Sequence, residues 1–310
     1  MSETILQLSA EDVWSALEVI DPVAVLAEEL IGRTVGHAEE EVGRLTPWTG
    51  YGTRTNASAL VALEHPDVDG RCVLPAASLR MFQSAALAAI AARELLVPGG
   101  VTVAMLGATQ AMQPQLAVIA RHVPDISHVA ICLADLSRSN LLEARLVDLL
   151  ELSGIGLSVT TTWPDTVFGA NLVVATSEGV VRQDLSGMRV GQLARGAVLV
   201  NATGRNLPAE LVDRMAEVYV DDFSLLPGNG DRYIVSTHLL ATAGDTGVEQ
   251  TGRYIAADLG QLLAGEHGGR EHEDNRVLVE LLSGRRLNVQ LAYRILQAAR
   301  RNGLGSRFEL

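Results

Sequence analysis

Between residues 101 and 220 the sequence repeats one pattern, in which a short apolar run is followed by a helical or turn-forming segment. A continuous apolar run of about four to eight residues is typical of a strand that is buried on both faces. Strands that alternate with helices form a parallel sheet with helices on both faces, because right-handed crossovers join neighbouring parallel strands. The pattern therefore predicts an α/β fold with a doubly wound parallel sheet. Its expected strands are 101–106, 128–134, 155–161, 171–175, 196–200 and 218–220.

The two ends of the chain read mainly as helix. Ser9 stands before two acidic residues and Pro22 follows an aspartate, and both arrangements are typical of the first turn of a helix. Helices are expected within 1–45, 76–96, 246–265, 275–282 and 288–301, and one short strand within 57–63. We expect two domains. The sheet domain spans 99–269, and a smaller, reduced domain is built from both chain ends, 1–98 and 270–310.

The composition excludes several classes of protein. The chain has 37 acidic and 24 basic residues, a net charge of −13, and no basic stripe that would bind nucleic acid. Every basic residue is arginine, so no mechanism can use a lysine Schiff base. No apolar stretch is long enough to cross a bilayer, and we find no secretory signal pattern. Cys72 and Cys132 fit a reducing compartment, and neither the cysteines nor the histidines have metal-ligand spacing. We expect a cytoplasmic protein without a metal.

The first expected strand leads through Gly107 into a helical segment, which is where dinucleotide-binding proteins place their phosphate loop. Glycine lets the backbone approach a pyrophosphate, and the start of the helix supplies N–H donors. A full G-x-G-x-x-G motif would need glycines where the chain has Thr109 and Met112. Gly107, Ala108, Thr109 and Gln110 are therefore candidates for cofactor binding, and an ordinary turn between strand and helix is an equal alternative.

Polar residues follow the second expected strand. Asp135, Ser137 and Arg138 stand where a dinucleotide site holds the adenosine ribose. An acid at this place binds the ribose hydroxyls, whereas serine and arginine suit a 2′-phosphate. Capping of the next helix by Asp135 or Ser137 explains the same residues equally well.

Two further strands of the expected sheet end in small polar residues. One strand ends in Ala175, Thr176 and Ser177, and Thr203 and Gly204 come after the next. In open α/β sheets, ligands bind outside the carboxyl ends of the strands, and small residues there leave room for a nicotinamide ribose. Ordinary turn and capping chemistry is the alternative.

Together these segments resemble the ornithine cyclodeaminase/μ-crystallin family of NAD(P)-dependent enzymes. The resemblance is carried by DVWSALEVIDPVAVLAEEL, Arg80 with SAALAAIAARELL, MLGATQAMQPQLAVI, LVVATSEGVV, LARGAVLVNATGRNLPAEL and VYVDD. It implies a Rossmann-like domain that binds NAD or NADP, and a smaller domain that binds an amino acid or imine and forms a homodimer. It also implies that Arg80 contacts the substrate carboxylate, a role that suits a guanidinium group.

The chain departs from this family at positions that bear on chemistry. Aligned on Gln110, the two loop glycines of the family fall on Leu106 and Ala108, with Gly107 between them. Either both glycines are replaced or the loop is one residue shorter. The acid of the family's G-S-D-x-P segment aligns with Asn206, and an amide cannot act as a carboxylate base. The family's substrate-binding lysine has no counterpart in a chain without lysine.

Three functions remain open. The first is an NAD(P)-dependent oxidoreductase that reduces an imine or oxidises an amino acid, with Arg80, Asn206 and Asp222 as its candidate catalytic residues. Asp222 is a candidate proton donor, and helix capping or pairing with Arg232 is the alternative for it. The second is a cyclodeaminase that removes ammonia from ornithine or lysine through a bound-NAD redox cycle. The third is a catalytically degenerate family member that acts as a binding or partner subunit.

Overall fold

A computed structural model of the chain describes residues 4–36, 43–48, 59–68, 70–107, 109–132, 142–176, 188–242 and 254–309. The chain divides into two compact units. The first unit contains Met1–Ala86 and Ser283–Leu310, and the second contains Leu87–Leu282. Within the described residues, no helix combines the length and the apolar composition that a membrane span requires.

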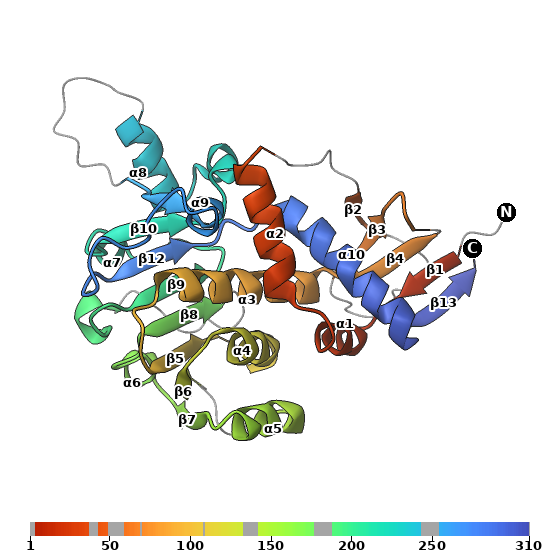
Figure 1. The fold of residues 1–310 in the computed structure, drawn as a ribbon, viewed down its shortest axis with the longest axis horizontal. Coiled ribbons are helices and arrows are strands. Elements are labelled where there is room, and N and C mark those ends of the chain that lie inside the picture. The colour runs from red at the N-terminus through yellow and green to blue at the C-terminus, as the bar shows by residue number, and fades with distance from the viewer. Residues whose placement is uncertain are drawn as a thin grey trace. The chain divides into compact units, whose positions relative to one another are not determined.

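The second unit is built on an eight-stranded sheet in which every neighbouring pair is parallel. The strand order is β11-β10-β12-β9-β8-β5-β6-β7. Figure 1 shows the strands from β10 to β7 in a row down the left of the view. The bounds are β5 (Val101–Leu106), β6 (Ile126–Cys132), β7 (Gly156–Thr160), β8 (Leu172–Thr176), β9 (Val198–Ala202), β10 (Glu217–Val220), β11 (Ala257–Asp258) and β12 (Val277–Glu280).

The order of the first five of these strands is that of a Rossmann domain. Read from the β7 edge, strands β7, β6, β5, β8 and β9 give the order 3-2-1-4-5. The residues of β8, β9, β10 and β12 are all buried, as expected for strands covered on both faces. The predicted doubly wound parallel sheet is confirmed.

Helices connect these strands and lie on both sides of the strand row. Figure 1 shows α4 and α5 on one side of it and α6 on the other. Their bounds are α4 (Thr109–His122), α5 (Ala144–Leu152), α6 (Trp163–Val167), η2 (Val190–Gln192), α7 (Ala209–Val212), η3 (Phe223–Asn229), α8 (Tyr233–Thr242) and α9 (Leu259–Leu263). This placement on two faces is the doubly wound arrangement that right-handed crossovers produce.

The first unit contains a five-stranded mixed sheet in the order β13-β1-β4-β3-β2. Strand β1 pairs with β13, so both ends of the chain belong to one sheet. Helices α1 and α2 pack on α10. The elements are β1 (Thr4–Gln7), α1 (Ala10–Leu17), α2 (Pro22–Thr34), β2 (Arg44–Pro47), β3 (Leu60–Glu64), β4 (Arg71–Pro75), α3 (Ala76–Leu95), which continues into the second unit, α10 (Arg285–Asn302) and β13 (Ser306–Glu309).

The helix starts expected from the sequence are confirmed. Ser9 accepts a hydrogen bond from the Asp12 backbone N–H, and the Asp12 carboxylate accepts one from the Ser9 N–H, which is a capping box. Asp21 accepts hydrogen bonds from two backbone N–H groups at the start of α2, and Pro22 occupies the first turn.

Several sequence-based assignments were wrong, and strands β2 and β4 were not predicted. The helix expected over 275–282 is instead strand β12, in the middle of the parallel sheet. A short apolar run fits a buried strand as well as a buried helix, and here the neighbouring strands decide. Residues 4–7, expected as helix, form β1, and the strand β13 near the chain end was not predicted. Both of these strands depend on their pairing with each other, which no local pattern shows.

Candidate functional site

The switch point of the parallel sheet lies between β5 and β8. The chain runs from β5 to β6 and β7 on one side, and then returns to β8 and β9 on the other. In open α/β sheets, ligands bind outside the carboxyl ends of the strands at this point. Leu106 of β5 is in register with Ala175 of β8, so Gly107 and Thr176 follow at neighbouring positions of the same edge.

The turn after β5 is short. Gly107 follows the strand directly and α4 begins at Thr109, so two residues separate strand from helix. Gly107 has a φ of 155°, a backbone conformation that side-chain-bearing residues rarely adopt. Thr109 and Gln110 lie in the first turn of α4, where the N–H groups have no partner within the helix. Such a helix start is suited to an anion such as a pyrophosphate.

At the end of β8, one buried hydroxyl group has no hydrogen-bond partner among the residues that the structure describes. Ala175 and Thr176 are fully buried, and within the described residues the Oγ1 of Thr176 makes no hydrogen bond. Leaving a buried polar group unsatisfied costs about 1–3 kcal/mol. Among the described residues, the Thr176 hydroxyl is thus a buried group at this edge whose hydrogen-bonding capacity is unused.

The β9 turn, residues 201–206, follows the next strand of the same edge. Asn201 is fully buried, and its Oδ1 accepts hydrogen bonds from the Thr203 N–H at 3.2 Å and from the Thr203 hydroxyl at 2.7 Å. The Arg205 N–H donates to the Thr203 hydroxyl at 3.0 Å. Gly204 has a φ of 70°, in the left-handed region that favours glycine. The base of the turn is thus buried and hydrogen-bonded, while residues 204–206 are exposed.

A buried ion pair stands behind the β9 turn, and the sequence analysis did not predict it. Arg232 pairs with Glu280, and their side chains are 7% and 4% exposed. Burial lowers the pKa of the Arg232 guanidinium, while the charges of Asp231 and Asp221 raise it. Asp221 is also fully buried and accepts a hydrogen bond from the Leu282 N–H. The sequence did contain a signal for this pair, namely charged residues next to apolar runs. A charged residue that is buried with such a run almost always has a partner, so these positions could have indicated a buried ion pair.

The three predicted catalytic residues lie in different settings. Asn206 is exposed, and its side chain accepts a hydrogen bond from the Tyr233 N–H at 2.7 Å and donates one to the Asp231 carbonyl at 3.3 Å. Asp222 is buried and accepts a hydrogen bond from the Ser224 N–H at the start of η3. Arg80 is exposed on α3, in the first unit.

Some predicted residues lie outside the part of the chain that the structure describes. They are the cofactor candidates Ala108, Asp135, Ser137, Arg138 and Ser177. Among the described residues, the structure brings Gly107, Thr176 and the β9 turn to one edge of one sheet. In the same described ranges, no three His, Cys, Asp or Glu side chains form a group that could hold a metal ion.

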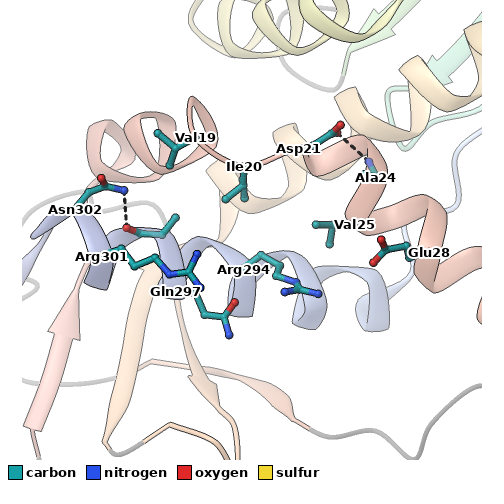
Figure 2. A pocket seen from close by; sticks show the side chains of 11 residues that line it. Val19, Ile20, Asp21, Ala24, Val25, Glu28, Arg294, Gln297, Arg301 and Asn302 are labelled. Carbon is teal, nitrogen blue, oxygen red and sulfur yellow. Dashed lines mark hydrogen bonds between the residues drawn. The ribbon is translucent and has the colours of Figure 1, made fainter.

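The first unit carries a separate groove with a volume of about 450 Å³. It lies between α10 and the corner that joins α1 to α2, and none of the predicted site residues lines it. Figure 2 shows the carboxylate of Asp21 turned to the backbone of α2 and the amide of Asn302 turned to the Ala298 carbonyl of α10. Arg294 and Arg301 supply positive charge from α10, and Glu28 supplies negative charge from α2.

No protein-family model and no curated protein sequence matches this chain. Solved structures do match it over nearly its whole length. CmnK is 20% identical with a TM-score of 0.72, and the match covers 100% of this chain and 99% of CmnK. The Δ1-pyrroline-2-carboxylate reductase of Thermococcus litoralis is 13% identical with a TM-score of 0.67, covering 97% and 99%. A lysine cyclodeaminase is 14% identical with a TM-score of 0.64, covering 99% and 95%. The chain therefore has the two-domain fold of ornithine cyclodeaminase-like proteins and their NAD-dependent structural relatives, the fold that the resemblance in sequence implied.

Proposed function

We propose that this protein is an NAD(P)-dependent oxidoreductase that reduces an imine or oxidises an amino acid. The observation that carries the proposal is the switch point of the Rossmann-type sheet. There Gly107 and the start of α4 stand beside the unpartnered hydroxyl of Thr176. A helix start suits a pyrophosphate, and a free hydroxyl suits a ribose or carboxamide group.

The structural neighbours support the chemical class of the ligands. The Thermococcus litoralis reductase was solved with NADH and L-proline, and the lysine cyclodeaminase recognises L-lysine and L-ornithine. Both proteins have the fold of this chain, so the same fold accommodates a nicotinamide cofactor and amino acids. We extend this ligand class to the present protein as part of the proposal.

We assign the following binding roles to residues of the chain. The Gly107 turn and the first turn of α4, with Thr109 and Gln110, hold the pyrophosphate, and Thr176 and the β9 turn face the nicotinamide end. When bound, the cofactor supplies or accepts the hydride. Arg80 binds the substrate carboxylate through its guanidinium group. The side chains of Asn206 and Asp222 already accept hydrogen bonds from backbone N–H groups. We therefore propose that they position their turns and do not transfer protons.

A catalytically degenerate binding or partner subunit is the second candidate. It is favoured by Asn206, whose amide both donates to and accepts from the backbone and replaces the family's acid. The same replacement counts against a cyclodeaminase, which needs that acid for proton transfer.

We include a homodimer in the cytoplasm in the proposal. The resemblance to the family suggests the dimer, and two buried cysteines that form no disulfide suit a reducing compartment. Sedimentation of the purified protein over a range of concentrations tests the dimer. A monomer at all concentrations would remove it from the proposal.

Calorimetry with NAD⁺, NADH, NADP⁺ and NADPH tests the central claim. At least one of them should bind with a dissociation constant of tens of micromolar or tighter, about −6 kcal/mol or below. If none binds, the oxidoreductase and the cyclodeaminase are both excluded, and the partner subunit is the remaining candidate.

Arg80 is tested separately, once a substrate has been found by screening amino acids and imines. Arg80→Ala should raise KM about tenfold or more and leave the dissociation constant of the cofactor unchanged. Arg93→Ala, which removes another exposed arginine from the same helix, is the matched control. An unchanged KM in Arg80→Ala removes Arg80 from the substrate site.

A further inference from the structure

The Arg232–Glu280 pair lies at the carboxyl edge of the parallel sheet, inside the second unit. Glu280 is the last residue of β12 and is in register with Asn201 of β9 on one side and with Val220 of β10 on the other. The edge that a ligand of the proposed kind would approach therefore contains a buried acid and a buried base.

The two charged side chains form hydrogen bonds to opposite ends of the β9 turn. The Asn201 amide donates to both carboxylate oxygens of Glu280, at 3.1 and 2.8 Å. Arg232 Nη2 donates to the Arg205 carbonyl at 3.0 Å, and the Asn201 amide donates to the same carbonyl at 2.8 Å. Glu280 thus fixes the start of the turn and Arg232 fixes its end, while the ion pair fixes the distance between the two.

Stability alone does not explain such a pair. Removing two charges from water costs several kcal/mol per ion, and a well-packed apolar pair of similar volume is often equally or more stable. Arg232 also keeps a buried Nε–H that has no hydrogen-bond partner among the described residues. What an apolar pair could not supply is the set of directed hydrogen bonds to the β9 turn.

We infer that Arg232 and Glu280 are positioning residues, which hold the β9 turn in the shape that receives the nicotinamide end of the cofactor. This inference rests on the proposed function for the identity of the ligand. The claim that the pair holds the β9 turn is independent of the proposed function, because it can be measured without any ligand.

The test is a double variant, Arg232→Met with Glu280→Leu, compared with Glu280→Leu alone. The single variant leaves a buried charge unpaired and should be much less stable, whereas the double variant should unfold near the temperature of the unchanged protein. The matched control is Arg195→Gln with Asp274→Asn, an ion pair of the same unit whose side chains are 80% and 76% exposed.

Two readouts are taken on the double variant. Native-state hydrogen exchange should be about tenfold or more faster at the amides of Thr203 and Arg205, and unchanged in helix α4. NADH should bind about tenfold more weakly, as expected for the loss of one or two well-placed hydrogen bonds. The control pair should change neither.

Each outcome has a definite meaning. If the double variant is stable and hydrogen exchange in its β9 turn is unchanged, the inference is overturned, because the pair then does not stabilise the turn. Faster exchange with unchanged NADH binding also overturns it, because the turn then has no part in receiving the cofactor. If the unchanged protein binds no nicotinamide nucleotide, the proposed function fails, and hydrogen exchange still decides whether the pair holds the turn.

Discussion

The two ends of strands β10 and β12 carry similar polar groups with different surroundings. At the carboxyl end, Glu280 meets Arg232 and Asn201 behind an exposed turn. At the amino end, Glu217 accepts hydrogen bonds from the Tyr219 hydroxyl at 2.6 Å, from an asparagine amide at 2.7 Å and from the Glu271 N–H. Burial and the nearby carboxylate raise the pKa of Tyr219, so its hydroxyl stays protonated and donates.

The difference between the two ends is what each carboxylate holds. Glu217 accepts hydrogen bonds from the segment 271–275, which leads into β12, and so holds that segment in place. Glu280 ties down a turn whose tip is exposed at the edge where ligands bind in α/β sheets. A buried carboxylate of this kind holds a segment of the fold at the amino end, and at the carboxyl end it holds a turn that we propose to be part of a binding site. Four measurements can break or sharpen this comparison.

The largest effect is expected for Glu217→Leu. The loss of its carboxylate leaves the Tyr219 hydroxyl, the Asn275 amide and the Glu271 N–H without their acceptor. The free energy of unfolding in urea should fall by about 3 kcal/mol or more. NADH affinity, measured well below the unfolding midpoint, should not change. A weaker affinity would show that the two ends of the sheet are not separate in function.

A smaller loss of stability is expected for Gly107→Ala, together with a clear loss of binding. The φ of 155° strains an alanine by about 1–2 kcal/mol. Under the proposed function, a methyl group added to this turn also hinders the close approach of the pyrophosphate to the backbone. NADH should bind about tenfold more weakly. Gly99→Ala is the control, because Gly99 has a φ of 143° and nothing within 4 Å of an added Cβ. Equal binding losses in the two variants would remove Gly107 from the cofactor site.

Asn206→Asp tests the turn from its exposed tip. A carboxylate still accepts the Tyr233 N–H but cannot donate to the Asp231 carbonyl, so the free energy of unfolding should fall by about 1 kcal/mol. Asn206→Ala loses both hydrogen bonds and should be the less stable of the two variants. A gain of deaminase activity in Asn206→Asp alone would contradict the positioning role that we assign to this side chain.

The smallest effect is a pH dependence at His238. Burial lowers the pKa of this imidazole below its ordinary value of 6.5, and its Nδ1 accepts the Ile255 N–H at 3.0 Å. The unfolded chain therefore binds the proton first as the pH falls. The stabilisation is complete above the ordinary pKa and is lost as the pH falls through the lower, folded value. His238→Gln should reduce the loss of unfolding free energy as the pH falls below 6.5. If the free energy of unfolding falls with pH as steeply in the variant as in the unchanged protein, His238 is not the cause of that fall.

Much of the fold follows from local sequence. The apolar runs that became β5 to β10 were long enough and regular enough to be identified as strands, because burial on both faces demands apolar residues throughout. Ser9, Asp21 and Pro22 marked helix starts for reasons that act within one turn of the chain. The turn at Gly107 was recognisable for the same reason, since a strand, a glycine and a helix follow one another directly.

The candidate site itself needed the tertiary structure. Asn201 and Glu280 are separated by 79 residues, and they meet only because β9 and β12 are neighbours in the sheet. The sequence read the segment of β12 as helix, which hid the position of Glu280 at the edge. The periodicity of a short apolar run cannot choose between strand and helix, and partners distant in sequence make that choice. Local chemistry thus determined where the strands and caps lie, whereas the order of the strands decided which polar side chains meet.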